Sequence, residues 1–225
     1  MFDGFGAKIV GLFRNYSDLF LVGTGVTLLL SILTVGIGVV LGSLLSLLKR
    51  SRIKPLSWLA TVYIEIVRGT PLLLQLFLFY FVIPNAVTFI NMSEFTSVAT
   101  ALALNSAAYV AEIIRAGIQS IDKGQSEAAR SLGMTKSQTM WRIVFPQAVK
   151  NILPSLCNEF IMVIKETSLA STFFIGDIMT QYKIIQGITF LAFEPLIIIA
   201  AIYFTLTFLL SKLVSVYERR LATSD

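Results

Sequence analysis

Long apolar runs alternate with short basic segments along this chain. The first run, Leu19–Leu48, contains no charged residue and is followed directly by Lys49 and Arg50. Because an α-helix needs about 20 predominantly apolar residues to cross a bilayer, this run predicts a membrane-spanning helix. Four further spans are predicted on the same basis, at Leu56–Ile83, Phe95–Ala116, Phe145–Ile164 and Glu194–Lys212.

The second predicted span is interrupted by Gly69, Thr70 and Pro71. Proline lacks a backbone donor and clashes with the preceding helical turn, so we expect this span to kink at that point. Membrane helices tolerate such a break when neighbouring side chains satisfy the freed backbone groups. The whole pattern predicts an all-α membrane protein with five transmembrane helices.

The basic residues are distributed unevenly between the loops. Thirteen of the 18 Lys and Arg residues fall in three segments, whereas residues 85–94 contain none. Because Lys and Arg accumulate in cytoplasmic loops, the N-terminus is predicted outside and the C-terminus inside. The predicted organisation is an extracytoplasmic N-terminal segment at 1–18, a transmembrane domain at 19–215 with a cytoplasmic loop at 119–142, and a cytoplasmic tail at 216–225.

Composition agrees with a membrane protein and excludes several classes. Hydrophobic residues make up 56% of the chain and charged residues 14%, against about a quarter charged in soluble domains. The mean hydropathy is +0.80. A single cysteine and no histidine leave almost no material for metal, disulfide or imidazole chemistry. We therefore expect no metal site. The net charge of +5 is explained by the basic flanks of the spans, so we also expect no nucleic-acid partner.

The cytoplasmic loop predicts two short helices. In the first helix Ser126 is a plausible N-cap, and Gly133 supplies a left-handed stop. Thr135 and Gln138 form a capping-box pattern that starts the second. A solvated linker fits this composition too, but small residues permit close approach of a partner and charged ones fix its orientation. The candidate contact residues are Glu127, Ala128, Ala129, Arg130 and Gly133.

The same loop resembles the signature of ABC importer permease subunits. That signature is Glu-Ala-Ala, three residues, Gly, nine residues, Ile, one residue and Leu-Pro. This chain has Glu127 to Ala129, then Gly133, Ile143 and Pro146 at those spacings. The one departure is Phe145 in place of leucine, and both side chains are large and apolar.

The resemblance covers most of the chain, from about Gly23 to Arg220, and is greatest to the polar amino acid subfamily. Three segments carry it, namely Glu65–Leu72, Tyr109–Ile118 and Lys165–Leu169. It implies a type I importer fold whose cytoplasmic loop is a coupling helix seated in an ATPase subunit. It also implies a multi-pass protein of a prokaryotic cell membrane.

The resemblance further implies that this chain is a transport subunit and not an enzyme. The phosphate-binding sequence Gly, four residues, Gly-Lys-Ser/Thr is absent, so ATP and Mg²⁺ would be held by the partner. The implied partners are two ATPase subunits, an extracytoplasmic binding protein and a second permease subunit, alike or related. The implied cargo is a polar amino acid.

Several polar residues lie within the predicted spans, where ionisable groups are costly and face protein or water. Glu65 with Arg68, and Glu112 with Arg115, are three residues apart and predict ion pairs within one helix. Glu159 has no basic residue three or four positions away, which makes a cationic substrate group a candidate partner and favours basic amino acids. The candidate substrate-binding residues are Gln75, Asn105, Ser106, Asn158 and Glu159.

Alternatives remain open at this point. Asn and Ser commonly form hydrogen bonds between membrane helices, so these candidates have an equally good structural explanation. An intramembrane enzyme lacks a catalytic cluster, since every aspartate falls outside the predicted spans. An ion-coupled transporter or passive channel leaves the loop signature unexplained. An importer of another small solute, such as methionine, is the alternative within the class.

Overall fold

The computed structural model describes residues 4–86 and 92–222, with side chains described up to residue 219. Parts of the predicted outer loop at 85–94 and of both predicted terminal segments therefore lie outside the described residues. Within the described ranges the chain is helical and has no strand. The α-helices are α1 (Phe5–Lys49), α2 (Lys54–Gly69), α3 (Leu72–Phe77), α4 (Ile83–Ala86), α5 (Glu94–Gln119), α6 (Lys123–Ser131), α7 (Lys136–Thr139), α8 (Phe145–Glu166), α9 (Ile178–Thr189) and α10 (Phe193–Ala222).

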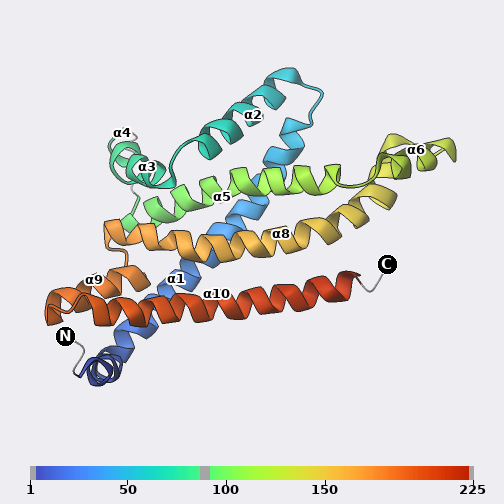
Figure 1. Cartoon of the computed structure of the whole chain (residues 1–225). Helices are drawn as coiled ribbons and strands as arrows, with labels where there is room; N and C mark the ends of the chain where they lie inside the picture. The colour runs from blue at the N-terminus through green and yellow to red at the C-terminus, as the bar shows by residue number, and fades with distance from the viewer. Residues whose placement is uncertain (1–3, 87–91, 223–225) are drawn as a thin grey trace.

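Three shorter elements join these helices. The π-helical turns η1 (Leu78–Val82) and η2 (Met140–Val144) precede α4 and α8, and the 3-10 helix η3 (Thr167–Phe173) follows α8. In Figure 1, α5, α8 and α10 lie roughly alongside one another, and α1 crosses behind them. The C-terminus and α6 lie at one end of this bundle, and the N-terminus and α9 lie at the other (Figure 1).

The predicted spans agree in part with the helices. Three helices, α1, α5 and α10, are long and apolar enough to cross a membrane. The pair of segments Lys54–Gly69 and Leu72–Ala86 passes the same test only when taken together. The remaining predicted span corresponds to α8, whose 22 residues include Lys150, Asn151 and Glu159 and make it less apolar than the others.

The predicted kink in the second span is confirmed. Its two parts are bent by 108° at the break between Gly69 and Leu72. Thr70 and Pro71 have extended backbone conformations there, with ψ angles of 147° and 134°. The fixed proline φ and its missing donor make this the weakest place in the helix.

The first helix extends further than the predicted span. It begins at Phe5, so residues 5–18 of the predicted N-terminal segment are helical, with a kink at Tyr16 where φ is −124° and ψ is 18°. Its far half packs closely against α5. A Cβ atom placed on Gly38 would lie 2.8 Å from the Ser106 Oγ, and one on Gly42 would lie 2.7 Å from the Ala107 carbonyl oxygen. Small residues bring these two backbones together, which is how membrane helices gain packing contacts.

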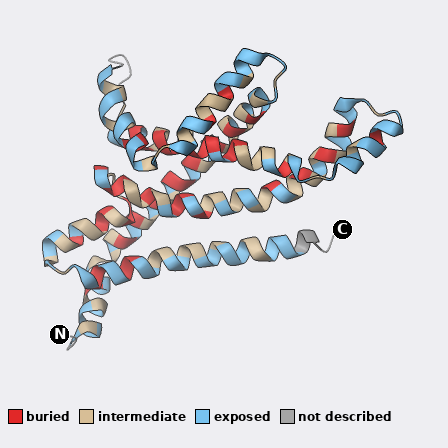
Figure 2. Ribbon diagram, turned by 45° about the horizontal axis from the view of Figure 1, so that its top comes forward, coloured by how far each residue is buried: buried red, intermediate tan, exposed pale blue. Residues whose placement is uncertain are grey.

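Burial is concentrated where α1 meets α5, η3 and α9. Figure 2 shows buried positions along these elements, whereas α10 and α6 are largely exposed or half-buried. One apolar cluster joins Leu30, Leu76 and Leu102, and a second joins Phe20, Ile185 and their neighbours. The exposed apolar faces of α1 and α10 are those that a bilayer or a partner helix would cover.

Candidate coupling and translocation site

The predicted cytoplasmic loop folds as two short helices that project beyond the ends of α5 and α8 (Figure 1). Asp122 caps the first, because its Oδ1 accepts a hydrogen bond from the Gly124 amide at 2.6 Å. The prediction that Ser126 is the N-cap is therefore wrong, since an earlier carboxylate takes that position. The Thr135 and Gln138 capping box is present, with both of its hydrogen bonds formed.

Gly133 ends the first helix in the left-handed conformation, with φ of +87°. The amide of Met134 bonds to the carbonyl of Ala129 at 3.1 Å, and that of Gly133 bonds to Arg130 at 3.0 Å. These bonds satisfy helix carbonyls that would otherwise be left open at the C-terminus. A Cβ atom on Gly133 would meet nothing within 4 Å, so its backbone conformation, not space, favours glycine here.

The residues predicted to contact an ATPase form an exposed surface on this segment. Glu127, Ala128 and Arg130 are exposed, whereas Ala129 is only 5% exposed. Leu132, which the sequence analysis did not single out, is 85% exposed. Leu132 thus adds an apolar side chain to a segment that also carries the charged Glu127 and Arg130. Its position between Arg130 and Gly133 in the motif was the signal that would have identified it.

The polar residues within the bundle form two hydrogen-bonded pairs. Ser106 on α5 donates to the Glu159 Oε1 on α8 at 3.0 Å. Asn105, the preceding residue on α5, turns to α3 and donates to the Gln75 Oε1 at 2.9 Å. These four candidates are thus brought together in two neighbouring contacts, while Asn158 is exposed and makes no hydrogen bond among the described residues.

Gln75 closes the break in the second span. Its amide group donates to the Val67 carbonyl at 2.8 Å and to the Thr70 Oγ1 at 2.9 Å. The Val67 carbonyl belongs to the last turn of α2, whose carbonyls have no partner within the helix. Because Asn105 holds the other end of the amide, the contact between Asn105 and Gln75 has a structural role in supporting the kink.

Glu112 forms the centre of a charged cluster that joins three helices. Its carboxylate lies 2.7 Å from the Lys49 Nζ, 2.7 Å from Arg115 and 3.5 Å from Arg68. The predicted pair of Glu112 with Arg115 is therefore present. The predicted pair of Glu65 with Arg68 is not formed among the described residues, because Arg68 reaches across to α5 and Glu65 is exposed.

The role of Lys49 was missed by sequence reasoning. It follows the first predicted span directly and was counted only as a basic flank. In the structure it donates to Glu112, 63 positions away, with its side chain 21% exposed. The contact depends on how α1 packs on α5, which the local sequence does not show.

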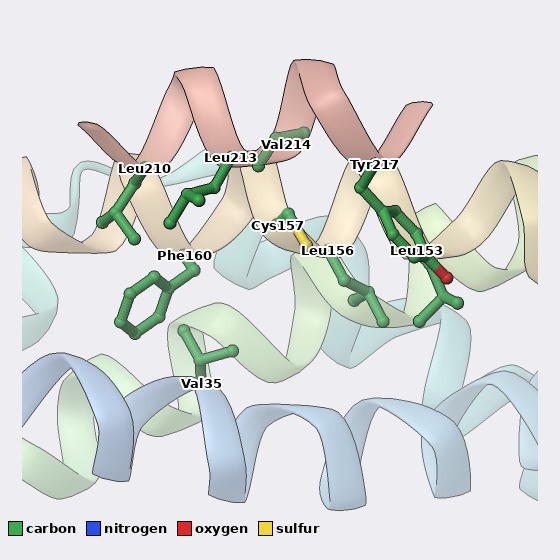
Figure 3. Close-up of a pocket in the computed structure, with 9 residues that line it drawn as sticks. All are labelled: Val35, Leu153, Leu156, Cys157, Phe160, Leu210, Leu213, Val214 and Tyr217. Atoms are coloured by element: carbon green, nitrogen blue, oxygen red, sulfur yellow. The ribbon is translucent and has the colours of Figure 1, made fainter. Parts of the chain in front are cut away.

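An apolar cavity of about 460 Å³ lies between α1, α8 and α10 (Figure 3). Val35, Phe160 and Leu213 converge on it from the three helices, and Cys157 points into it from α8 (Figure 3). Its described lining carries no charge. The cysteine is half-buried and acts as one small apolar wall group among several.

Long apolar helices, two polar pairs between them and an exposed loop that carries the signature are the features expected of a membrane-embedded transport component. Residues 36–223 match the family described as binding-protein-dependent transport system inner membrane component. The chain belongs to this family, and it is a multi-pass transport subunit and not an enzyme.

Individual relatives agree with this assignment. The chain is 42% identical to the arginine transport system permease protein ArtQ of Bacillus subtilis (strain 168), over 90% of this chain and 92% of that protein. It is 40% identical to the probable glutamine ABC transporter permease protein GlnM of the same organism, over 95% and 97%. Against the L-cystine transport system permease protein TcyB, also of Bacillus subtilis, identity is 39% over 87% and 83%.

Solved structures show the same fold. A crystal structure of an amino acid ABC transporter with histidines aligns with a TM-score of 0.88 and 52% identity, over 92% of this chain and 96% of that chain. An inward-facing MetNI methionine ABC transporter aligns with a TM-score of 0.72 at 16% identity, over 91% and 97%. The second likeness concerns the fold alone.

Proposed function

We propose that this chain is the permease subunit of an ATP-driven importer of polar amino acids. The exposed knuckle from Glu127 to Gly133 carries the proposal, because it matches the coupling signature and is folded as a capped helix with a free surface. On this proposal Glu127 and Arg130 orient the ATPase, and Leu132 supplies the apolar contact. Movement of the ATPase is passed through η2 into α8.

The substrate class is supported by the relatives and by the polar pairs. Relatives are named for transport of arginine, glutamine and cystine, which are polar amino acids. The Glu159 carboxylate accepts one hydrogen bond, from Ser106, and no cation pairs with it among the described residues. A substrate ammonium or guanidinium group is the complement of such a carboxylate, which favours basic amino acids within the class.

The proposed topology has five spans, with α8 as the fourth. The knuckle and the C-terminus lie at the same end of the bundle, and the N-terminus lies at the other (Figure 1), which agrees with an odd number of crossings. The distribution of basic residues supports a cytoplasmic knuckle and an N-terminus outside. We further propose a prokaryotic cell membrane as the location.

One copy of the chain offers too few polar groups to enclose a pathway, so the transporter would hold two permease subunits, identical or related. Two ATPase subunits would bind the two knuckles and hold ATP and Mg²⁺. An extracytoplasmic binding protein would deliver the amino acid. Closure of the ATPase pair around ATP would switch the pathway between the two permease subunits from inward-facing to outward-facing. ATP hydrolysis would then return it to the inward-facing state.

The test is ATP hydrolysis by the reconstituted permease and ATPase in the presence of the binding protein. Arginine, histidine, glutamine, cystine and methionine are each added to a binding protein free of ligand. We expect a polar amino acid to stimulate hydrolysis, with basic ones giving the largest effect. Stimulation by methionine alone would indicate a methionine importer in place of a polar amino acid importer. Hydrolysis that no ligand stimulates would argue against the proposed function.

A further inference from the structure

A second apolar cavity, of about 460 Å³, opens between α1, α5, η2 and α8. Val39 and Leu47 line it from α1, Ile118 from α5 and Leu156 from α8. Arg50, at the end of α1, is the one charged residue among the described residues of its lining. The cavity therefore combines apolar walls with a cation at one end.

The guanidinium group of Arg50 is not neutralised by the protein. Lys49, its neighbour, is paired with Glu112 at 2.7 Å, but the described side chains include no carboxylate that pairs with Arg50. Of two consecutive cations at the end of this helix, one is thus held inside the protein and the other is left exposed at the cavity. An exposed cation beside apolar surface is suited to an amphiphilic anion.

The cavity has the depth of about one leaflet. Val39 and Arg50 are eleven positions apart in the sequence, which corresponds to roughly 16 Å along an α-helix, against about 15 Å for half of the hydrocarbon core. Trp141, which is 63% exposed, lines the same cavity. Tryptophan is enriched at the boundary between hydrocarbon and headgroups, so this end of the cavity fits that boundary.

We propose that this cavity binds an anionic phospholipid of the cytoplasmic leaflet, with its phosphate on Arg50 and an acyl chain between α1 and α8. Arginine forms paired, charge-assisted hydrogen bonds with phosphate oxygens. Basic pockets between membrane helices on the cytoplasmic side bind anionic headgroups. The assignment to the cytoplasmic leaflet depends on the proposed orientation of the chain, whereas the assignment of an anionic lipid depends on the lining of the cavity. The cavity of Figure 3 has no charged lining residue and lacks such a partner.

The site adjoins the coupling segment. Met140 and Trp141 in its wall belong to η2, which joins α7 to α8, and Phe145 is the first residue of α8. A lipid held there contacts this stretch and α1 at once. Its occupancy therefore braces the segment through which the knuckle moves α8.

Native mass spectrometry of the permease and ATPase complex tests the proposal. The complex is released in mild detergent and exposed to equal amounts of phosphatidylglycerol and phosphatidylcholine. We expect the unchanged complex to retain phosphatidylglycerol preferentially, and Arg50→Gln to lower that preference about fivefold. Arg52→Gln, a neighbouring exposed cation outside the cavity lining, is the matched control and keeps the preference.

A second variant tests the apolar part of the site and serves if Arg50→Gln fails to assemble. Ser43 is half-buried in the cavity wall, so Ser43→Phe fills the space and is expected to reduce retained lipid with Arg50 intact. Equal effects of Arg50→Gln and Arg52→Gln, or no effect of Ser43→Phe, would overturn the proposal. So would a change in the number of permease subunits without a change in lipid, which would mean that a second copy covers the cavity.

Discussion

The Ser106 hydroxyl donates a hydrogen bond to the Glu159 carboxylate at 3.0 Å, and this contact joins α5 to α8 inside the bundle. The residues are 53 positions apart and belong to helices on either side of the coupling knuckle. Any displacement of α8 relative to α5 must change this contact. The pair thus lies where movement of the knuckle and recognition of a substrate would meet.

Replacing Glu159 with glutamine tests the role of this carboxylate. Glutamine keeps an acceptor for Ser106 but removes the charge that would bind a cationic substrate. We expect the KM for arginine to rise about tenfold or more, since charge-assisted hydrogen bonds are roughly twice as strong as neutral ones. Uptake of a neutral amino acid should change much less. Equal losses for both substrates would indicate a structural role for Glu159.

The left-handed backbone of Gly133 makes the knuckle sensitive to substitution. Leucine at this φ of +87° costs about 1 to 2 kcal/mol, so Gly133→Leu should distort the knuckle and abolish transport without preventing membrane insertion. Gly133→Asn is the matched control, because asparagine tolerates this conformation, and it should retain most activity. Normal uptake by Gly133→Leu would contradict a coupling role for the segment.

Close packing of α1 on α5 is tested by adding a single methyl group. Gly42→Ala places a carbon 2.7 Å from the Ala107 carbonyl oxygen, and overpacking of this kind costs about 1 to 3 kcal/mol. We expect a lower temperature of thermal unfolding in detergent. Gly36→Ala meets nothing within 4 Å and should leave that temperature unchanged. If both variants melt alike, the two helices are not packed as described.

Glu112 neutralises cations from three helices, so its loss should loosen them together. Its side chain is 12% exposed, and a hydrogen bond to a charged group contributes about 1.5 to 3 kcal/mol. Because Arg68 and Arg115 are partly exposed and screened, we expect Glu112→Gln to cost the lower part of that range in thermal unfolding. Glu65→Gln is the control and should have little effect. If Glu65→Gln lowers stability more than Glu112→Gln does, Glu65 and not Glu112 is the main partner of Arg68.

Sequence patterns predicted the elements that depend on local chemistry. The kink at Pro71, the stop at Gly133 and the capping box at Thr135 each follow from the backbone preference of a residue and its near neighbours. The assignment of Ser126 as an N-cap failed because Asp122, four residues earlier, caps the helix instead. Short helices in polar loops often leave this choice open.

Contacts between helices were harder to predict. The pairing of Glu112 with Lys49 and Arg68 depends on the approach of α1 and α2 to α5, for which spacing within one helix carries no information. For Asn105, the sequence left substrate binding and helix contact equally open. In the structure Asn105 makes the helix contact, because it holds Gln75 against the carbonyls that the break in the second span leaves free.

Uptake of labelled arginine into liposomes tests the central claim most directly. The liposomes contain the permease and its ATPase, with the binding protein outside, and ATP is present or absent on the side of the knuckle. We predict uptake that requires ATP and falls severalfold in Glu127→Ala, because Glu127 would orient the ATPase through charged hydrogen bonds. Uptake that is equal without ATP and unchanged in Glu127→Ala would contradict the coupled importer and leave an ion-coupled transporter or passive channel.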